Sequence, residues 1–365
     1  MKIAMIGLRG LGDGLGGIEK AVREISLRMA ADGHDVTCYC KSPYSKENEY
    51  QGVKLVNIKT RKGKYLETLL YSIKAILHAC RSNYDIIHIH ALASSCLAWI
   101  PKFIYRKKVV ITVHGLDWQR AKWGFLARQI LKLGEWASVK FSDVTLCVSK
   151  SLTMYYRMKY CNETVKYIPN GCDISYEKYF PLNGFETGSY FLFMGRLVPE
   201  KGVHKLIQAY QLAETDKKLV IAGPSFDKKY EKQLKELAGD NANIHFIGTV
   251  KGKEKIQLLS NAYLFLLPSD IEGLPIALLE AASYGVCTAV SSIPTCEEVI
   301  DHHLISCGFQ FSPDSVSELS SVLSCASKTP TLVKTIGQKL KEQVIENYDW
   351  EKISKESIEA YKLAS

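Results

Sequence analysis

Long hydrophobic runs are missing from this sequence. A helix that crosses a membrane needs about 18 or more consecutive apolar residues, and the nearest run, Cys96 to Tyr105, is broken by Pro101 and Lys102. The sequence therefore predicts a chain that does not span a bilayer. Its start, MKIAMIGLRG, has too few apolar residues before Gly7 for a signal peptide and is typical of a first strand. We expect a cytoplasmic location.

Sequence patterns for metal binding are also missing. The chain has 11 cysteines and no C-x-x-C pair. An odd number of cysteines in apolar segments is typical of reduced, buried thiols. No D-x-D carboxylate cluster is present either, and Asp270 and Glu272 come nearest to one. We therefore expect neither a metal site nor a bound cofactor.

The charge balance has a moderate positive excess. The chain contains 47 Lys and Arg against 38 Asp and Glu, a formal net charge of +9 over 365 residues. Such an excess fits an anionic ligand or an anionic surface as partner. Because the sequence contains no recognised nucleic-acid module and no dense basic stripe, we expect no nucleic-acid partner.

Two series of strand-like runs follow one another along the chain. Short runs rich in Ile and Val alternate with helical patterns, pause over a stretch with Pro and Gly at 168–186, and then resume. This alternation is typical of parallel, doubly wound sheets, and the length exceeds what one core usually serves. The predicted fold is α/β, with two Rossmann-like domains facing each other across a cleft. The expected domains are residues 1–175, residues 185–345, and a C-terminal helix at 346–365 that in one arrangement crosses back to the first domain.

A glycine-rich loop, Gly7 to Gly17, joins the first predicted strand to a helix. Glycines let a backbone approach a ligand closely, and a helix N-terminus presents free N–H groups to anions. The loop is therefore either a phosphate cradle or a merely flexible turn. Its spacing differs from G-x-G-x-x-G, and Cys38, Cys40 and Lys41 stand where a dinucleotide fold has an acidic residue, which disfavours NAD.

A second strand-to-helix turn, Gly195 to Gly202, carries two cations. Arg196 and Lys201 flank this turn, so both side chains are able to reach one anionic group above the sheet. The alternative for Lys201 is a solvated surface charge. That alternative is weaker for Arg196, which follows directly after a predicted buried strand.

A third segment, Glu272 to Glu280, surrounds the start of a short helix. Pro275 fits the first helical position, which leaves Glu272 in the preceding loop. Glu280 interrupts an otherwise apolar helical stretch, and a buried carboxylate needs a partner. Ligand hydroxyls and a neighbouring Lys or Arg are both open as that partner.

Taken together, these segments resemble the GT4 family of retaining glycosyltransferases, which have the GT-B fold. The family's E-x7-E signature matches Glu272 and Glu280, and the resemblance covers nearly the whole chain. It is closest in kind to bacterial polysaccharide and lipopolysaccharide glycosyltransferases. The other segments that carry it are Gly16-Gly17-Ile18-Glu19, Gly33-His34-Asp35-Val36, Thr112-Val113-His114-Gly115, Val148-Ser149-Lys150, Ile168-Pro169-Asn170-Gly171-Cys172-Asp173, and Gly195-Arg196 with Lys201-Gly202.

The resemblance implies roles for particular residues. The implied catalytic set is His114 beside the transferred sugar, Arg196 and Lys201 at the donor diphosphate, and Glu272 at hydroxyls of the donor sugar. Glu280 would hold the ribose hydroxyls. From the residues alone, His114 is also typical of a core histidine at a strand end. The implied donor-binding set is Gly16, Gly17, Arg196, Lys201, Gly273, Leu274, Pro275 and Glu280.

The implied reaction is hexosyl transfer, with retention and without a metal, from a nucleotide-sugar to a saccharide or lipid-linked saccharide acceptor. A UDP-sugar is favoured over a GDP-sugar, and the setting is cell-surface polysaccharide biosynthesis. The sequence departs from the family in the extra Gly12-Asp13-Gly14 and in lacking Pro after Gly285. A GT-B sugar-nucleotide epimerase and a non-catalytic nucleotide-sugar-binding subunit are the competing interpretations. A phosphorylase-like enzyme is disfavoured because it is usually far longer.

Acceptors of such enzymes bind mainly the first domain. The segment after His114 supplies the acceptor-side candidates Asp117, Trp118 and Arg120, and the Trp118 ring suits either a sugar ring or a hydrophobic anchor. The basic, amphipathic stretch 59–81, with the cations at 102 and 106–108, has two interpretations. It is either an ordinary helix on its own sheet or a peripheral contact with anionic lipid at the inner face of the cell membrane.

Overall fold

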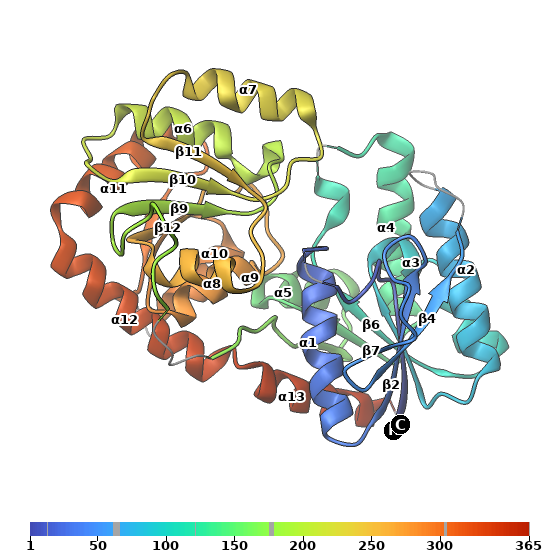
Figure 1. Cartoon of the computed structure of the whole chain (residues 1–365). Helices are drawn as coiled ribbons and strands as arrows, with labels where there is room; N and C mark the ends of the chain where they lie inside the picture. The colour runs from blue at the N-terminus through green and yellow to red at the C-terminus, as the bar shows by residue number, and fades with distance from the viewer. Residues whose placement is uncertain (13, 61–65, 121, 175–178, 303–304, 365) are drawn as a thin grey trace. The chain divides into compact units, whose positions relative to one another are not determined.

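A computed structural model of the chain describes residues 1–12, 14–60, 66–120, 122–174, 179–302 and 305–364 (Figure 1). The chain forms two compact units. Unit 1 comprises Met1–Gly171 with Trp350–Ser365, and unit 2 comprises Cys172–Asp349. In the part of the chain that the structure describes, every helix is too short or too polar to cross a lipid bilayer.

Unit 1 is built on an eight-stranded sheet with the order β3-β4-β2-β1-β5-β6-β7-β8. All neighbouring strands are parallel except β3 and β4. The strands are β1 (Lys2–Ile6), β2 (Asp35–Lys41), β3 (Glu49–Tyr50), β4 (Val53–Ile58), β5 (Ile86–His90), β6 (Lys108–Val113), β7 (Val144–Cys147) and β8 (Val165–Tyr167). The helices are α1 (Gly17–Ala31), α2 (Leu66–Arg81), α3 (Leu92–Ser95), the π-helical η1 (Ile100–Ile104), the 3-10 helix η2 (Asp117–Gln119), α4 (Phe125–Lys140), α5 (Lys150–Tyr160) and α13 (Trp350–Leu363).

Successive side chains of strand β5 pack on opposite faces of this sheet. Ile87 and Ile89 pack in one core with residues of α2, whereas His88, one position along, reaches Tyr361 of α13 on the other face. Helix α13 packs along α1 and against β7, so the last described helix belongs to unit 1 (Figure 1).

Helix α2 packs its apolar stripe on its own sheet. Tyr71, Ala75, Ile76 and Ala79 are buried in the core, which agrees with the first of the two interpretations of this basic stretch. Leu69 remains largely exposed. Residues 61–65 and the side chain of residue 66 lie outside what the structure describes.

Unit 2 is built on a parallel sheet with the order β11-β10-β9-β12-β13-β16, beside a small antiparallel pair, β14 and β15. Its core gathers aromatic and aliphatic side chains of β9, β10, α6 and α11. The strands are β9 (Tyr190–Met194), β10 (Lys218–Ala222), β11 (Ile244–Gly248), β12 (Leu264–Leu267), β13 (Cys287–Ser291), β14 (Asp301–His302), β15 (Ile305–Ser306) and β16 (Phe309–Phe311). The helices are the 3-10 helix η3 (Pro199–Lys201), α6 (Val203–Leu212), α7 (Lys228–Ala238), α8 (Gly252–Asn261), α9 (Ile276–Ser283), α10 (Pro294–Ile300), α11 (Val316–Lys328) and α12 (Pro330–Asn347).

The predicted fold class is confirmed, because both units are doubly wound around a parallel sheet. Details differ from the sequence prediction by single residues: α9 begins at Ile276, so Pro275 caps the helix instead of starting it. The cysteines are free, and most are buried as predicted, but Cys161 and Cys325 are exposed.

One glycine holds two loops of unit 2 against each other. Gly202 has a φ of +67°, and a Cβ added there would lie 1.9 Å from the carbonyl oxygen of Pro268, which follows β12. The turn after β9 therefore contacts the loop after β12 at a distance that only glycine permits.

We expect Gly202→Ala to lower the free energy of unfolding of unit 2 by about 3 kcal/mol, because strain at positive φ adds to a backbone clash. Gly188 of unit 2 is the control, since its φ is +73° and nothing lies within 4 Å of an added Cβ. Gly188→Ala should cost only about 1 kcal/mol. Equal losses in thermal unfolding of the two variants would contradict the close contact.

Candidate functional site

The order of the strands marks one place in unit 2 where ligands are expected. From β9 the chain winds outward through β10 and β11 on one side, and through β12, β13 and β16 on the other. Ligands of open α/β sheets bind beyond the carboxyl ends of the strands at such a switch point. The segments after β9 and β12 are the two that the sequence singled out, Gly195–Gly202 and Glu272–Glu280.

A carboxylate and a lysine join these two segments. Lys201, at the end of η3, forms an ion pair with Glu272 of the loop after β12. Ser269, which is fully buried, donates its hydroxyl to the same Glu272 oxygen at 2.7 Å. A backbone bond from the Asp270 N–H to the Glu200 carbonyl (2.9 Å) adds to the connection. Two predicted site residues, Lys201 and Glu272, are thus in direct contact.

A second ion pair, between Lys205 and Asp270, lies beside the contact between Lys201 and Glu272. Lys205 of α6 contacts Asp270 at 2.6 Å and donates to the carbonyl oxygen of Pro313 at 2.7 Å. The Asp270 side chain is far more exposed than that of Glu272. Asp270 therefore shares the loop of Glu272 while having a different partner and surroundings.

Arg196 follows β9 directly and is half-buried. The turn that carries it is packed tightly, because a Cβ at neighbouring Gly223 would lie 1.8 Å from the carbonyl oxygen of Gly195. The Leu197 N–H donates to the carbonyl of Pro224 at 2.9 Å, which fixes the backbone just after Arg196. The guanidinium is therefore carried by a rigid turn at the same switch point as Lys201.

Helix α9 places Glu280 among buried apolar side chains. Its neighbours Leu278, Leu279, Ala281 and Ala282 are buried, and Glu280 is itself buried. Its carboxylate lies 2.6 Å from Nζ of Lys255, which belongs to α8. Of the two partners left open by the sequence, the neighbouring lysine is the one present.

The predicted backbone donors lie just before α9. Gly273 is half-buried, whereas Leu274 and Pro275 are buried, and Pro275 at the cap position has no polar side chain to accept from the first amide groups of the helix. The N-terminal end of a helix carries a partial positive charge. An anion bound there would lie on the same loop as Glu272.

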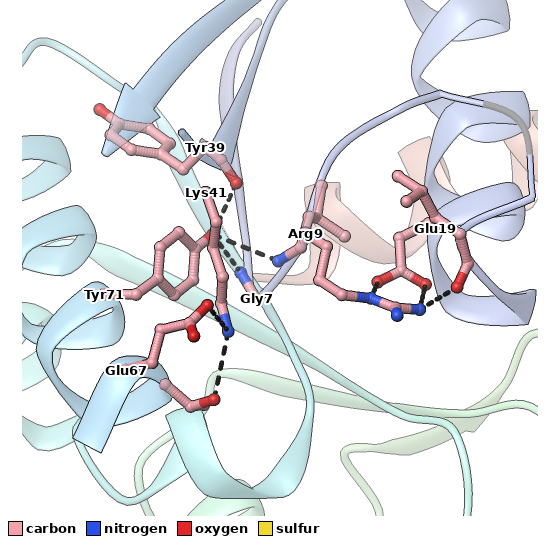
Figure 2. A network of polar contacts seen from close by, with 10 residues as sticks. Gly7, Arg9, Glu19, Tyr39, Lys41, Glu67 and Tyr71 are labelled. Carbon is pink, nitrogen blue, oxygen red and sulfur yellow. Dashed lines mark hydrogen bonds and ion pairs between the residues drawn. The ribbon is translucent and has the colours of Figure 1, made fainter. Parts of the chain in front are cut away.

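Unit 1 has a corresponding turn after β1, shown in Figure 2. The N–H groups of Gly7 and Leu8 both donate to the Tyr71 hydroxyl, at 3.1 and 3.2 Å, and that hydroxyl donates to the carbonyl of Tyr39. These first loop amides are satisfied by the protein itself. Lys41, which lies 3.6 Å from Glu67, is a further charge beside this turn (Figure 2).

Arg9 and Glu19 span the glycine-rich loop. Their side chains are 2.7 Å apart, and Arg9 also donates to the carbonyl oxygen of Leu15 (Figure 2). Burial, the largest single influence, would raise the pKa of Glu19, but the hydrogen bond and positive charge of Arg9 together with backbone hydrogen bonds outweigh burial and lower it. Gly16 caps α1, and a Cβ there would lie 2.8 Å from both charged groups, while Gly17 begins the helix. The predicted cradle residues therefore adjoin a built-in ion pair.

His114 ends a row of three histidines in unit 1. His88 lies 2.7 Å from both the Tyr361 hydroxyl and the Thr112 hydroxyl, and its ring is 4.0 Å from that of His90. Nδ1 of His90 lies 3.3 Å from Nε2 of His114. Burial lowers the pKa of His88 to about 3 and that of His114 to about 4, and it holds the pKa of His90 well below its usual range. At neutral pH the His114 ring is therefore uncharged.

The acceptor-side candidates are engaged within unit 1. The Trp118 indole donates to Glu135 at 2.6 Å, and Asp117 pairs with Arg120 at 3.2 Å. Glu135 has no exposed surface and also accepts from Lys159 at 2.6 Å. In this arrangement Trp118 is an anchor of its loop, the second of the two roles considered for it.

Sequence reasoning missed several residues of these sites. Lys255 and Ser269 contact the two carboxylates of unit 2, while Arg9 and Tyr71 shape the loop after β1. Arg9 lies in the quoted glycine-rich loop and was open to assignment as a partner of Glu19. Lys255 carries no such signal, because it is one of several lysines in a polar helix. Among the described residues, no three His, Cys, Asp or Glu side chains are placed to share a metal ion.

Comparisons with known proteins identify the family. Residues 15–176 match the family described as Glycosyltransferase Family 4, and residues 176–348 match Glycosyl transferases group 1. The chain belongs to the GT4-type glycosyltransferases. The predicted family is thereby confirmed, and so is the prediction that the protein is an enzyme.

Relatives of this glycosyltransferase are distant in sequence but similar over most of their length. It is 28% identical over 305 residues to an uncharacterised glycosyltransferase of Methanocaldococcus jannaschii, covering 77% of this chain and 76% of that protein. It is 25% identical over 318 residues to the O-antigen biosynthesis glycosyltransferase WclY of Escherichia coli, covering 83% of each. The crystal structure of Anabaena Alr3699/HepE in complex with UDP and glucose matches with a TM-score of 0.82, at 19% identity and 99% coverage of each chain. The fold is therefore GT-B.

The histidine row predicts that the enzyme loses stability in mild acid. The folded-state pKa values lie below the value of about 6.5 for an unfolded histidine, so the unfolded chain binds more protons as the pH falls below that value. Stability is then lost between about pH 6.5 and pH 4, at up to about 1.4 kcal/mol per pH unit for each histidine. Melting temperatures between pH 7.5 and 5 should fall less steeply for His114→Asn than for the unsubstituted enzyme. Identical slopes would contradict a neutral, buried His114.

The contact between Glu280 and Lys255 leads to a prediction about stability. Lys255→Met leaves a buried carboxylate without its partner, so we expect the free energy of unfolding to fall by about 1 to 3 kcal/mol. The double variant Lys255→Met/Glu280→Gln should recover most of this loss, because it removes the charge as well. Lys253→Met, at an exposed position of the same helix, is the matched control and should change stability by less than about 0.5 kcal/mol. Failure of the double variant to recover stability would show that the pair does not interact as described.

Proposed function

We propose that this glycosyltransferase moves a hexose, with retention and without a metal, from a nucleotide-sugar to a saccharide or lipid-linked saccharide. The favoured donor is a UDP-sugar, and the product is a cell-surface polysaccharide or a related glycoconjugate. The observation that carries the proposal is the ion pair between Lys201 and Glu272, which joins the segments after β9 and β12 at the switch point of unit 2.

The ion pairs of unit 2 suit an exchange of partners when the donor binds. Lys201 forms an ion pair with Glu272. A diphosphate offers Lys201 a stronger anionic partner, and the sugar hydroxyls then become partners of Glu272. Glu280 takes the ribose hydroxyls in the same way, beside Lys255. Each buried charge thus keeps a partner in the free and bound states, as burial requires.

The same groups suit the chemistry of the transfer. Cleavage of a sugar–phosphate bond passes through a cation-like transition state while negative charge grows on the departing nucleoside diphosphate. Arg196, Lys201 and the N-terminal end of α9 stabilise that growing charge, a task that a divalent metal performs in other enzymes. In this mechanism the donor phosphate accepts the proton of the acceptor hydroxyl, and no protein base is assigned.

Unit 1 supplies His114 and the acceptor side in this proposal. A neutral imidazole in a fixed row donates or accepts a hydrogen bond without adding charge beside a cation-like sugar. Asp117 and Arg120 are the proposed acceptor contacts, with Trp118 fixing their segment through Glu135. If the acceptor saccharide is carried on a lipid, the enzyme acts at the inner face of the cell membrane.

The relatives support the donor and the setting of the reaction. The similar Anabaena protein was crystallised with UDP and glucose and, separately, with UDP-glucose. The similar E. coli protein is named for O-antigen biosynthesis. The first agrees with a uridine nucleotide-sugar as donor, and the second agrees with a surface polysaccharide as product.

Nucleotide binding tests the donor. UDP at about 100 times its Kd should stabilise the folded enzyme by about 2.7 kcal/mol and raise its melting temperature, whereas GDP and dTDP should do so less. Glu272→Gln should lower kcat/KM by a factor of about 100 or more, because it weakens contacts to the transferred sugar. Asp270→Asn, in the same loop with Lys205 as its partner, should retain activity within about threefold.

Three results would contradict the proposal. The first is the absence of stabilisation by any nucleoside diphosphate, and the second is near-normal activity of Glu272→Gln. The third concerns metal and stereochemistry: activity abolished by EDTA and restored by a divalent ion, or a product with inverted anomeric configuration by NMR, would exclude the proposed mechanism.

A further inference from the structure

One face of helix α4 exposes a stripe of large apolar side chains. Phe125, Leu126, Ile130, Leu133 and Trp136 are between 43% and 80% exposed. From residue 126 onward their spacing is four, three and three, which places them along one side of a helix. Surface apolar residues are common singly, but a continuous stripe of this size marks an interaction site.

A second element extends the stripe. Phe103 and Ile104, at the end of η1, are each about 60% exposed. The Phe103 ring lies edge-on to Phe141, and so does the Trp136 ring, with centroids 5.7 and 5.2 Å apart. Through Phe141 the exposed side chains of η1 and of α4 form one surface, which we call the α4 face.

The opposite side of α4 is fixed to unit 1. Gly134 packs so closely on α3 that a Cβ there would lie 1.9 Å from the carbonyl oxygen of Leu92. Glu135, fully buried, accepts hydrogen bonds from Trp118, Tyr155 and Tyr160 at 2.6 to 3.0 Å. A helix held by these contacts is not free to rotate its apolar stripe inward. The packing of α4 on unit 1 therefore fixes the stripe in its exposed position.

The charge around the α4 face is mainly positive. Between residues 99 and 143 the sequence contains nine Lys and Arg and three acidic residues, Asp117, Glu135 and Asp143. Glu135 is buried, Asp117 is paired with Arg120, and Asp143 is paired with Lys102. Exposed cations lie on α4 itself, at Arg128, Lys132 and Lys140.

We propose that the α4 face docks on a lipid bilayer that contains anionic phospholipids. Aromatic and aliphatic side chains flanked by Lys and Arg on one helix are the pattern of a helix that lies in a membrane interface. Each cation near an anionic surface strengthens binding about fivefold. A second copy of the chain fits less well, because its α4 face would bring the same cations against each other.

This inference deepens the proposed function, since a lipid-linked acceptor presents its saccharide at such a surface. It also moves the expected membrane contact from the stretch at 59–81, whose helix is packed on its sheet, to α4. Vesicle binding requires neither donor nor acceptor, so the surface is testable without the reaction.

The test is flotation of the full-length enzyme with vesicles. We expect binding to phosphatidylcholine vesicles with 30% phosphatidylglycerol by mole, weakening by tenfold or more as salt rises from about 0.05 to 0.5 M, and little binding to pure phosphatidylcholine. Phe125→Ser/Leu126→Ser should reduce binding at least tenfold, and Arg128→Gln/Lys140→Gln should reduce it at low salt. Leu332→Ser, at an exposed leucine of α12 in unit 2, is the control and should bind as the unsubstituted enzyme does.

Two outcomes would overturn the proposal. One is binding that the α4 variants leave unchanged. The other is no binding to anionic vesicles. If light scattering then shows a dimer that Phe125→Ser/Leu126→Ser dissociates, the face is assigned to a second copy. Binding of UDP by the same variants, measured by thermal shift, separates loss of docking from loss of the donor site or of the fold.

Discussion

The turn after β9 and the loop after β12 lie in direct contact, and the candidate donor site depends on that contact. Gly202 brings the two backbones together against Pro268, and the ion pair between Lys201 and Glu272 joins their side chains. Neighbouring strands of a parallel sheet end at one edge, so their following loops meet there. Two carboxylates and two cations are thereby positioned on a rigid sheet edge, which is the preorganisation that electrostatic stabilisation of a leaving group requires.

Unit 1 meets a different constraint, because it also buries polar groups away from the charged loop after β1. Its histidine row is neutral, and its buried Glu135 is surrounded by donors from η2 and α5. Buried polar groups that keep their partners make a local structure specific. The row connects α13 to His114 through Tyr361. The same packing leaves the outer side of α4 apolar and basic.

Much of the fold was predictable from the sequence, because strands such as β10 are short runs of Val, Ile and Leu bounded by Gly. Glu272 and Arg196 were predictable as site candidates since each follows such a run closely. Lys255 was not, because its pairing with Glu280 depends on how α8 packs on α9. The orientation of α4 was not predictable either, since apolar periodicity shows that a helix has two faces without showing which one is buried. The experiments on the donor and on vesicles address these two points separately.

The central claim is that the paired charges at the β9 and β12 edge form the nucleotide-sugar site. A crystal structure of the enzyme with UDP tests it most directly. We expect the ribose hydroxyls within hydrogen-bond distance of Glu280, and the diphosphate against Arg196, Lys201 and the amide groups that begin α9. A diphosphate bound elsewhere, with Lys201 still paired to Glu272 and Glu280 remote from the ribose, would contradict it.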